Sequence, residues 1–259
     1  MNLNRSADAD WELWGDKNPY FAVIGDPRCL DANLDGAAIQ EFFSSGERHV
    51  EHLYEVIRKA IRPEFQPARV LDYGCGTGRL VIPFSARAQT VVGIDISTGM
   101  LKKARGNCDK FGASSAQLLH LDEMPSLAPG SFDFVHSFIV FQHIPVAEGE
   151  LILHELIELL AEGGIGALHF TYSRPRSVLK RAALALRYRF RIVHKLVNLI
   201  KGRSLSAPGM QMNEYSMNRI FNILMDAHCT IMRVEFSDHS GARGAMLYFE
   251  KSSSRISRL

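Results

Sequence analysis

The stretch Arg69–Leu80, RVLDYGCGTGRL, decides the fold of this chain of 259 residues. It begins as an apolar strand that ends on Asp72, continues into glycines at every second position, Gly74, Gly76 and Gly78, and then enters a helix. Glycine allows positive φ and has no Cβ, so a flat ligand can lie against the main chain. The pattern therefore predicts a ligand-binding turn between a strand and a helix.

The residues beside the glycines indicate which ligand the turn would hold. The dinucleotide fingerprint G-x-G-x-x-G requires a third glycine where this chain has Arg79, counted from Gly74, or Val81, counted from Gly76. A pyrophosphate would also face the like charge of Asp72 in a partly desolvated site. A carboxylate there suits a positively charged ligand, and S-adenosylmethionine has a sulfonium and an ammonium and no phosphate.

Five segments occur in the order and spacing of one protein family. DYGCGTG resembles motif I of the class I S-adenosylmethionine-dependent methyltransferases, and the resemblance continues through TVVGIDIS, LLHLDEMP, FDFVHSFIVFQHIP and LLAEGGIGALHF. The last segment departs from the family's L-x-P-G-G turn, because Glu162 replaces the proline. The resemblance implies S-adenosyl-L-methionine as cofactor, with Asp95 accepting from the ribose hydroxyls and Asp122 facing the adenine amino group. The cofactor-binding residues implied are Asp72, Gly74, Cys75, Gly76, Asp95, Ile96, Asp122, Glu123 and Ser137.

Strands and helical crossovers alternate through the centre of the chain. Strands are expected near residues 69–73, 90–95, 116–121, 132–138 and 165–171. Such alternation predicts a parallel sheet with helices on both faces and a ligand at the carboxyl ends of the strands. CTIMRVEF and GAMLYFEK, near the end, read as an antiparallel pair. We therefore expect an α/β fold with a Rossmann-like, doubly wound, seven-stranded sheet and a terminal antiparallel hairpin.

Three segments are expected to flank or interrupt this sheet. The predicted division is an N-terminal lid and helix at 1–62, a methyltransferase domain at 63–250 with a basic helical insert at 173–206 between strands five and six, and a disordered tail at 251–259. Within the first part, residues 47–61 read as a helix capped by Ser44 or Ser45.

The N-terminal segment contains both tryptophans of the chain, Trp11 and Trp14, followed by Tyr20 and Phe21. One interpretation is a hydrophobic staple that docks the N terminus onto the sheet domain. The other is a lid that closes over the cofactor and lines the acceptor pocket. In the second interpretation Tyr20 contacts the substrate.

Methyl transfer depends mainly on alignment, because the methyl group on a sulfonium is already activated. A hydroxyl or ammonium acceptor must also lose a proton. His143, just after the fourth strand, is the best-placed general base, although it can also serve only to shape the pocket. Tyr215, near the start of a helix expected over residues 211–227, is a second candidate substrate contact or a packing residue.

The insert at 173–206 contains ten lysines and arginines and no acidic residue, with apolar residues at helical spacing. It reads as a basic amphipathic helix or helix pair. It can cover the acceptor pocket, contact an anionic membrane surface, or dock nucleic acid. Nucleic acid is disfavoured because no RNA-binding module or aromatic stacking platform accompanies the charge.

Composition sets broad limits on the protein. The formal net charge is +2, and the four cysteines, Cys29, Cys75, Cys108 and Cys229, show no metal-ligand spacing. The amino terminus is acidic where a signal peptide would be basic and then apolar. We therefore expect a cytoplasmic protein without a metal site, with peripheral contact at the inner face of the membrane if the insert binds lipid.

The predicted function is transfer of a methyl group to a small-molecule or lipid-linked acceptor, with O-methylation of a saccharide or related metabolite preferred. An RNA methyltransferase and a non-catalytic module that binds S-adenosylmethionine are the alternatives. A nicotinamide-dependent oxidoreductase is disfavoured by Arg79, which stands where the dinucleotide fingerprint requires glycine.

Overall fold

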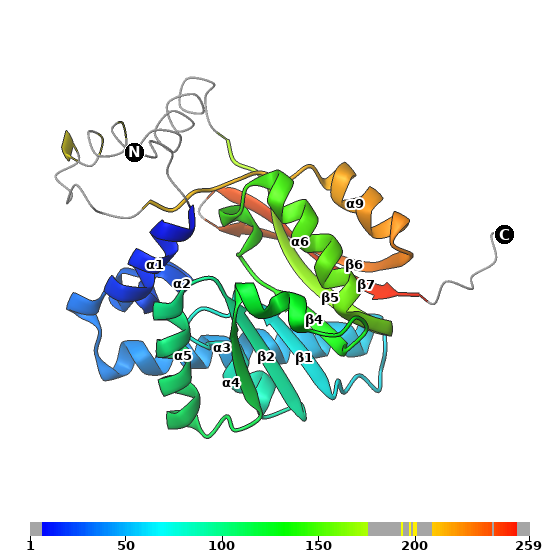
Figure 1. Cartoon of the computed structure of the whole chain (residues 1–259), viewed down its shortest axis with the longest axis horizontal. Coiled ribbons are helices and arrows are strands. Elements are labelled where there is room, and N and C mark those ends of the chain that lie inside the picture. Colours follow the sequence, from blue (N-terminus) through cyan, green and yellow to red (C-terminus); the bar gives the residue numbers. More distant parts are fainter. Residues whose placement is uncertain are drawn as a thin grey trace.

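A computed structural model describes residues 7–175, 209–239 and 241–252, together with the isolated positions Val193, Val197, Leu199 and Ile200. Its centre is a seven-stranded sheet in the order β3-β2-β1-β4-β5-β7-β6, in which β7 runs antiparallel to both neighbours and the other pairs are parallel (Figure 1). The predicted doubly wound sheet with a closing hairpin is confirmed. The strands are β1 (Arg69–Tyr73), β2 (Thr90–Asp95), β3 (Ala116–His120), β4 (Phe132–Ser137), β5 (Leu160–Ser173), β6 (Cys229–His239) and β7 (Ala242–Lys251).

Helices cover both faces of the sheet, as its alternating βα sequence dictates. On one face the apolar sides of α3, α4 and α5 pack against residues such as Val70 and Phe134. On the other face α6 and α9 pack against residues such as Leu71 and Val135. The bounds are α1 (Ala7–Lys17), α2 (Pro19–Ile24), α3 (Gly36–Ala60), α4 (Val81–Ser85), α5 (Thr98–Phe111), α6 (Val146–Leu159) and α9 (Met217–Asp226).

Two helix boundaries differ from the prediction. Helix α3 begins at Gly36 and not after Ser44 or Ser45, because the Asp35 side chain accepts from the backbone N–H of Ala38 at 2.7 Å and so caps an earlier start. The last helix begins at Met217, and residues 209–216 before it are not helical. In that segment the backbone N–H of Tyr215 donates to the Thr171 carbonyl at 2.8 Å, so β5 holds it in place.

The N-terminal segment docks onto the sheet domain next to α5. The Glu12 carboxylate accepts from the backbone N–H of Thr98 at 2.9 Å and from that of Gly99 at 3.3 Å. It therefore accepts from backbone N–H groups in the first turn of α5 that have no partner within the helix, and its negative charge interacts favourably with the positive end of the helix dipole. Trp14 Nε1 donates to the carbonyl of Gly209 at 3.1 Å, which links α1 to the segment after the insert.

Most of the predicted basic insert, 173–206, and of the predicted tail, 251–259, lies outside the described residues. The division of the chain into lid, domain and tail therefore stays a prediction. No helix within the ranges that are described is both long and apolar enough to cross a bilayer.

Candidate functional site

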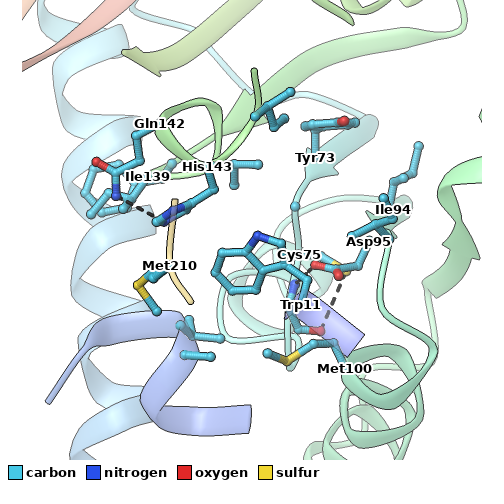
Figure 2. A pocket seen from close by; sticks show the side chains of 18 of the residues that line it. Trp11, Tyr73, Cys75, Ile94, Asp95, Met100, Ile139, Gln142, His143 and Met210 are labelled. Carbon is cyan, nitrogen blue, oxygen red and sulfur yellow. Dashed lines mark hydrogen bonds between the residues drawn. The ribbon is translucent and has the colours of Figure 1, made fainter. Parts of the chain in front are cut away.

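A cavity of about 360 Å³ lies at the carboxyl ends of β1, β2 and β4. This edge is where parallel α/β sheets bind ligands, and the volume lies in the range typical of small-molecule sites. The cavity is covered by residues from α1 and α2, including Trp11, Val23 and Ile24. Figure 2 shows the Trp11 indole between the side chains of His143 and Asp95.

The glycine turn after β1 forms the floor of the cavity. Gly74, Gly76 and Gly78 have φ of 77°, 55° and 82°, which L side chains rarely adopt. The backbone N–H groups of Gly74 and Cys75 donate to the Ile94 carbonyl at 2.8 and 2.9 Å. A Cβ at Gly74 would lie 2.2 Å from Cγ2 of Val140, so a side chain has no room there. The turn therefore has the bare backbone that the sequence predicts.

Asp95, at the end of β2, faces the cavity beside this turn. Its two carboxylate oxygens accept from the backbone N–H groups of Gly76 at 2.8 Å and Ser97 at 3.0 Å. Burial raises the pKa of Asp95 to about 6, against the lowering effect of these hydrogen bonds. Each oxygen keeps a further lone pair for a ligand hydroxyl. Ile96, the next residue, also lines the cavity.

Asp72 is buried at the end of β1, only 2% exposed, and lines the cavity. Its Oδ1 accepts from Nδ1 of His136 at 2.8 Å. Nε2 of His136 in turn lies 3.2 Å from Nε2 of His49 on α3.

Arg79, in the first turn after the glycines, is the residue whose role the sequence argument missed. It is 7% exposed and lines the cavity, its Nε has no hydrogen-bond partner, and its Nη1 donates to Ser45 Oγ only at 3.4 Å. No carboxylate forms a salt bridge with it among the described residues, and burial lowers its pKa to about 10 against the raising effect of the Asp72 charge. A buried, unpaired guanidinium beside a cavity fits an anionic ligand group. From sequence alone, an arginine next to the glycine turn argues only against a dinucleotide site.

His143 forms part of the opposite wall. Its Nδ1–H donates to the Gln211 carbonyl at 2.8 Å, so in the neutral ring Nε2 is an acceptor, and it accepts from Nε2 of Gln142 at 3.1 Å. The Trp11 ring meets it edge-on with ring centroids 4.8 Å apart. Burial lowers the pKa of His143 to about 4, which keeps the imidazole neutral near pH 7.

The rest of this wall is mainly apolar. Ile139, Ile144, Ile152 and the methionines Met210 and Met212 line it. Ile139 has a φ of 62°, which is strained for a β-branched residue and is characteristic of functional sites.

Glu148 of α6 adds a carboxylate to this lining, and its pKa is raised first by burial and then by the charge of Asp8. The wall that contains His143 and Glu148 therefore offers mainly apolar contact area and few polar groups.

Five of the predicted site residues do not line the cavity. The Asp122 side chain is 89% exposed, Glu123 caps its own short helix by accepting from the backbone N–H of His120, and Ser137 donates to the Tyr73 carbonyl at 2.9 Å. Leu121 is the residue of that segment that reaches the cavity.

The two tyrosines predicted to contact the substrate are packed elsewhere. Tyr20 is buried against Phe42 and Phe43, and its hydroxyl donates to Asn107 Oδ1 at 2.9 Å. The Tyr215 hydroxyl donates to the Ile144 carbonyl at 3.0 Å. The structure therefore brings together His143, Asp72, Gly74, Cys75, Gly76, Asp95 and Ile96.

Known proteins share this sequence pattern. Residues 70–164 match the family model described as "Methyltransferase domain". A ubiquinone biosynthesis O-methyltransferase of Psychrobacter arcticus is 27% identical over 169 residues, which cover 64% of this chain and 62% of that relative. The aklanonic acid methyltransferase DauC of Streptomyces sp. strain C5 is 34% identical over 100 residues, which cover 37% of this chain and 44% of that protein. The matches thus span less than two thirds of these relatives.

Solved structures share the fold. Magnesium protoporphyrin IX methyltransferase (ChlM) from Synechocystis PCC 6803, crystallised with bound SAM, has a TM-score of 0.61 and 19% identity, covering 97% of this chain and 100% of that one. The family model thus assigns residues 70–164 to a methyltransferase domain, and the likeness shows that the chain has the fold of a methyltransferase crystallised with bound SAM.

Proposed function

We propose that this protein is an S-adenosylmethionine-dependent O-methyltransferase that acts on a small, largely apolar acceptor bearing a hydroxyl group. One observation carries the proposal: a bare glycine turn, the Asp95 carboxylate and a buried arginine without a salt bridge line the same cavity. The first two suit a nucleoside, and the third suits an acid attached to it.

The residues present fit the cofactor. Asp95 would accept from the ribose hydroxyls, and Gly74 and Gly76 let the ligand approach the main chain. Arg79 would pair with the carboxylate of the amino-acid part, and Asp72 would face its ammonium group. When bound, the cofactor supplies a methyl group activated by the sulfonium.

The acceptor half of the cavity supports an apolar ring compound. Trp11, Ile139 and Met210 offer flat and adaptable apolar contacts. Nε2 of His143 would receive the hydroxyl proton in place of its hydrogen bond from Gln142, because Nδ1–H stays bonded to the Gln211 carbonyl. With a pKa of about 4 this imidazole is a weak base, so the proton would pass only as the methyl group is transferred. Similarity to proteins named O-methyltransferases supports oxygen as the methylated atom.

A saccharide acceptor, preferred from sequence, has less support because a sugar needs many hydrogen-bonding partners and this wall offers few. A lipid-linked acceptor fits the apolar lining better. A protein that only bound the cofactor would not require a second, apolar wall with an imidazole next to the cofactor site. No observation favours RNA as the substrate.

Isothermal titration against S-adenosylhomocysteine and NAD tests the cofactor assignment. We expect binding of the first and not of the second, and tighter NAD binding would overturn the proposal. Incubation with S-adenosylmethionine and two acceptor sets, phenols with apolar substituents and saccharides, followed by mass spectrometry, tests the acceptor class. Methylation confined to the saccharides would refute the apolar acceptor and leave the methyltransferase assignment in place.

A further inference from the structure

A chain of polar side chains crosses the otherwise apolar layer between α3 and the sheet. His136, fully buried on β4, bonds Asp72 of β1 on one side at 2.8 Å and His49 of α3 on the other at 3.2 Å. The rings of Phe84 and Phe134 pack against His136, with centroids 5.4 and 6.2 Å away. Buried polar chains contribute little net stability compared with apolar packing, so their placement calls for another reason.

Hydrogen-bond complementarity gives the direction of the inner bond of this chain. A carboxylate only accepts, so Nδ1 of His136 is the donor to Asp72. Of the two facing Nε2 atoms of His136 and His49, one donates and the other accepts. Burial, followed by the charges of His136 and Arg79, holds the pKa of His49 well below its usual range, so His49 is neutral.

The inner end of this chain reaches the cavity. Asp72 lines it and uses Oδ1 for His136, which leaves Oδ2 for a ligand donor. The donor from His136 fixes the orientation of the carboxylate. The arrangement resembles the way in which a buried acid and an imidazole orient each other in catalytic triads.

We propose that His136 and His49 are positioning residues that hold the Asp72 carboxylate aimed into the cavity, where it is the counter-ion for the amino group of an adenosyl amino acid. The inference rests on the proposed function, because that function supplies the ligand. It explains why a histidine pair occupies an apolar layer. It also assigns the two charges of the amino-acid part to different residues, the ammonium to Asp72 and the carboxylate to Arg79.

Other ionisable groups surround the chain. Arg79 faces both Asp72 and His49, and Asp95 faces Asp72 across the turn. His52 and His169 face His49. His169 lies on β5 and is buried like His136, but its Nε2 bonds Ser237 Oγ at 2.9 Å and not a carboxylate. It therefore serves as a matched control for loss of a buried imidazole.

Three nucleosides separate the charges of the ligand. S-adenosylhomocysteine has the ammonium and the carboxylate, its decarboxylated form has the ammonium alone, and methylthioadenosine has neither. In the His136→Leu variant we expect decarboxylated S-adenosylhomocysteine to bind about tenfold more weakly or worse, because Asp72, its counter-ion, is no longer held toward the cavity. Methylthioadenosine should bind within about twofold of wild type by the same reasoning. His136→Asn, whose amide nitrogen can replace Nδ1 as donor, should restore much of the affinity, and the His169→Leu control should change none of the three.

The possible results separate the inference from the proposed function. If the wild type binds none of the nucleosides, the proposed function fails. If the wild type binds them and His136→Leu weakens all three equally, His136 has only a structural role and the inference is wrong. Nitrogen-15 NMR of the histidines gives a check that needs no variant. We expect the ring proton of His136 on Nδ1, and a proton on Nε2 with none on Nδ1 would overturn the proposal.

Discussion

Arg79 provides the sharpest test of the site, because replacing it should move stability and affinity in opposite directions. In the ligand-free protein its guanidinium is 7% exposed, with Nε unpartnered and no carboxylate paired to it in the described part of the chain. Methionine has a similar length and no charge to desolvate. The pKa of Arg79 is lowered to about 10 because desolvation outweighs the attraction of the Asp72 charge, so replacing the guanidinium by an apolar side chain should be neutral or stabilising. We therefore expect Arg79→Met to unfold at the same temperature or about 2–4 °C higher, equivalent to about 1 kcal/mol.

The same change should weaken binding of a carboxylate-bearing ligand. Breaking a buried charge pair costs about 2–5 kcal/mol, and the lower end applies here because the cavity opens to solvent. A loss of about 2 kcal/mol corresponds to about 30-fold weaker binding of S-adenosylhomocysteine. Decarboxylated S-adenosylhomocysteine should bind wild type and variant alike, because it has no group for Arg79.

Isothermal titration and thermal unfolding measure the two effects on the same samples. The matched control is Arg48→Met, since Arg48 lies on the exposed side of α3 and pairs with Glu41 at 2.6 Å. It should change neither quantity appreciably. Equal weakening of both ligands by Arg79→Met, or a large fall in unfolding temperature with unchanged affinity, would refute the assignment of Arg79 to the carboxylate.

Three further changes test the remaining parts of the site. Burial raises the pKa of Asp95 from 3.8 to about 6, so the contribution of Asp95 to folding stability declines as pH rises through that interval. Thermal unfolding at several pH values should show this decline in wild type and not in Asp95→Asn. Parallel curves of unfolding temperature against pH for the two proteins would contradict the prediction. His143→Ala should lower kcat for a hydroxyl acceptor by about 100-fold or more with S-adenosylhomocysteine affinity unchanged, and an unaltered kcat would leave His143 a pocket-shaping residue. Gly74→Ala should reduce the unfolding temperature and abolish nucleoside binding, because its Cβ would lie 2.2 Å from Val140 at a φ of 77°; normal binding by calorimetry would show that the turn can adapt.

The sheet could be predicted from sequence because its signals are local. A glycine turn after an apolar strand, and acids at the ends of strands, follow from backbone geometry, and the structure places Asp72, Gly76 and Asp95 at one edge as expected. The predicted start of α3 is too late, because Asp35 and Ser44 are both acceptable caps by residue type, and it is the Asp35 side chain that accepts from the Ala38 N–H.

Side-chain partners were harder to predict because they depend on distant segments. The sequence allows Tyr215 to be either a substrate contact or a packing residue, and only β5 and the Ile144 carbonyl, which hold it in the core, decide between them. Asp122 points to solvent although its neighbour Leu121 reaches the cavity, a difference set by one short helical turn. The pairing of His49 with His136 joins residues 87 positions apart, and no local pattern indicates it.

Helix α1 carries a consequence for the kinetics of the protein. Through Glu12 it is fastened to the start of α5, and through Trp11 it meets His143 on the far wall. A single short helix thus covers the places proposed for both reactants. We expect compulsory-order kinetics. The adenosyl ligand would bind first, and α1 would then pack over it and complete the binding site for the acceptor.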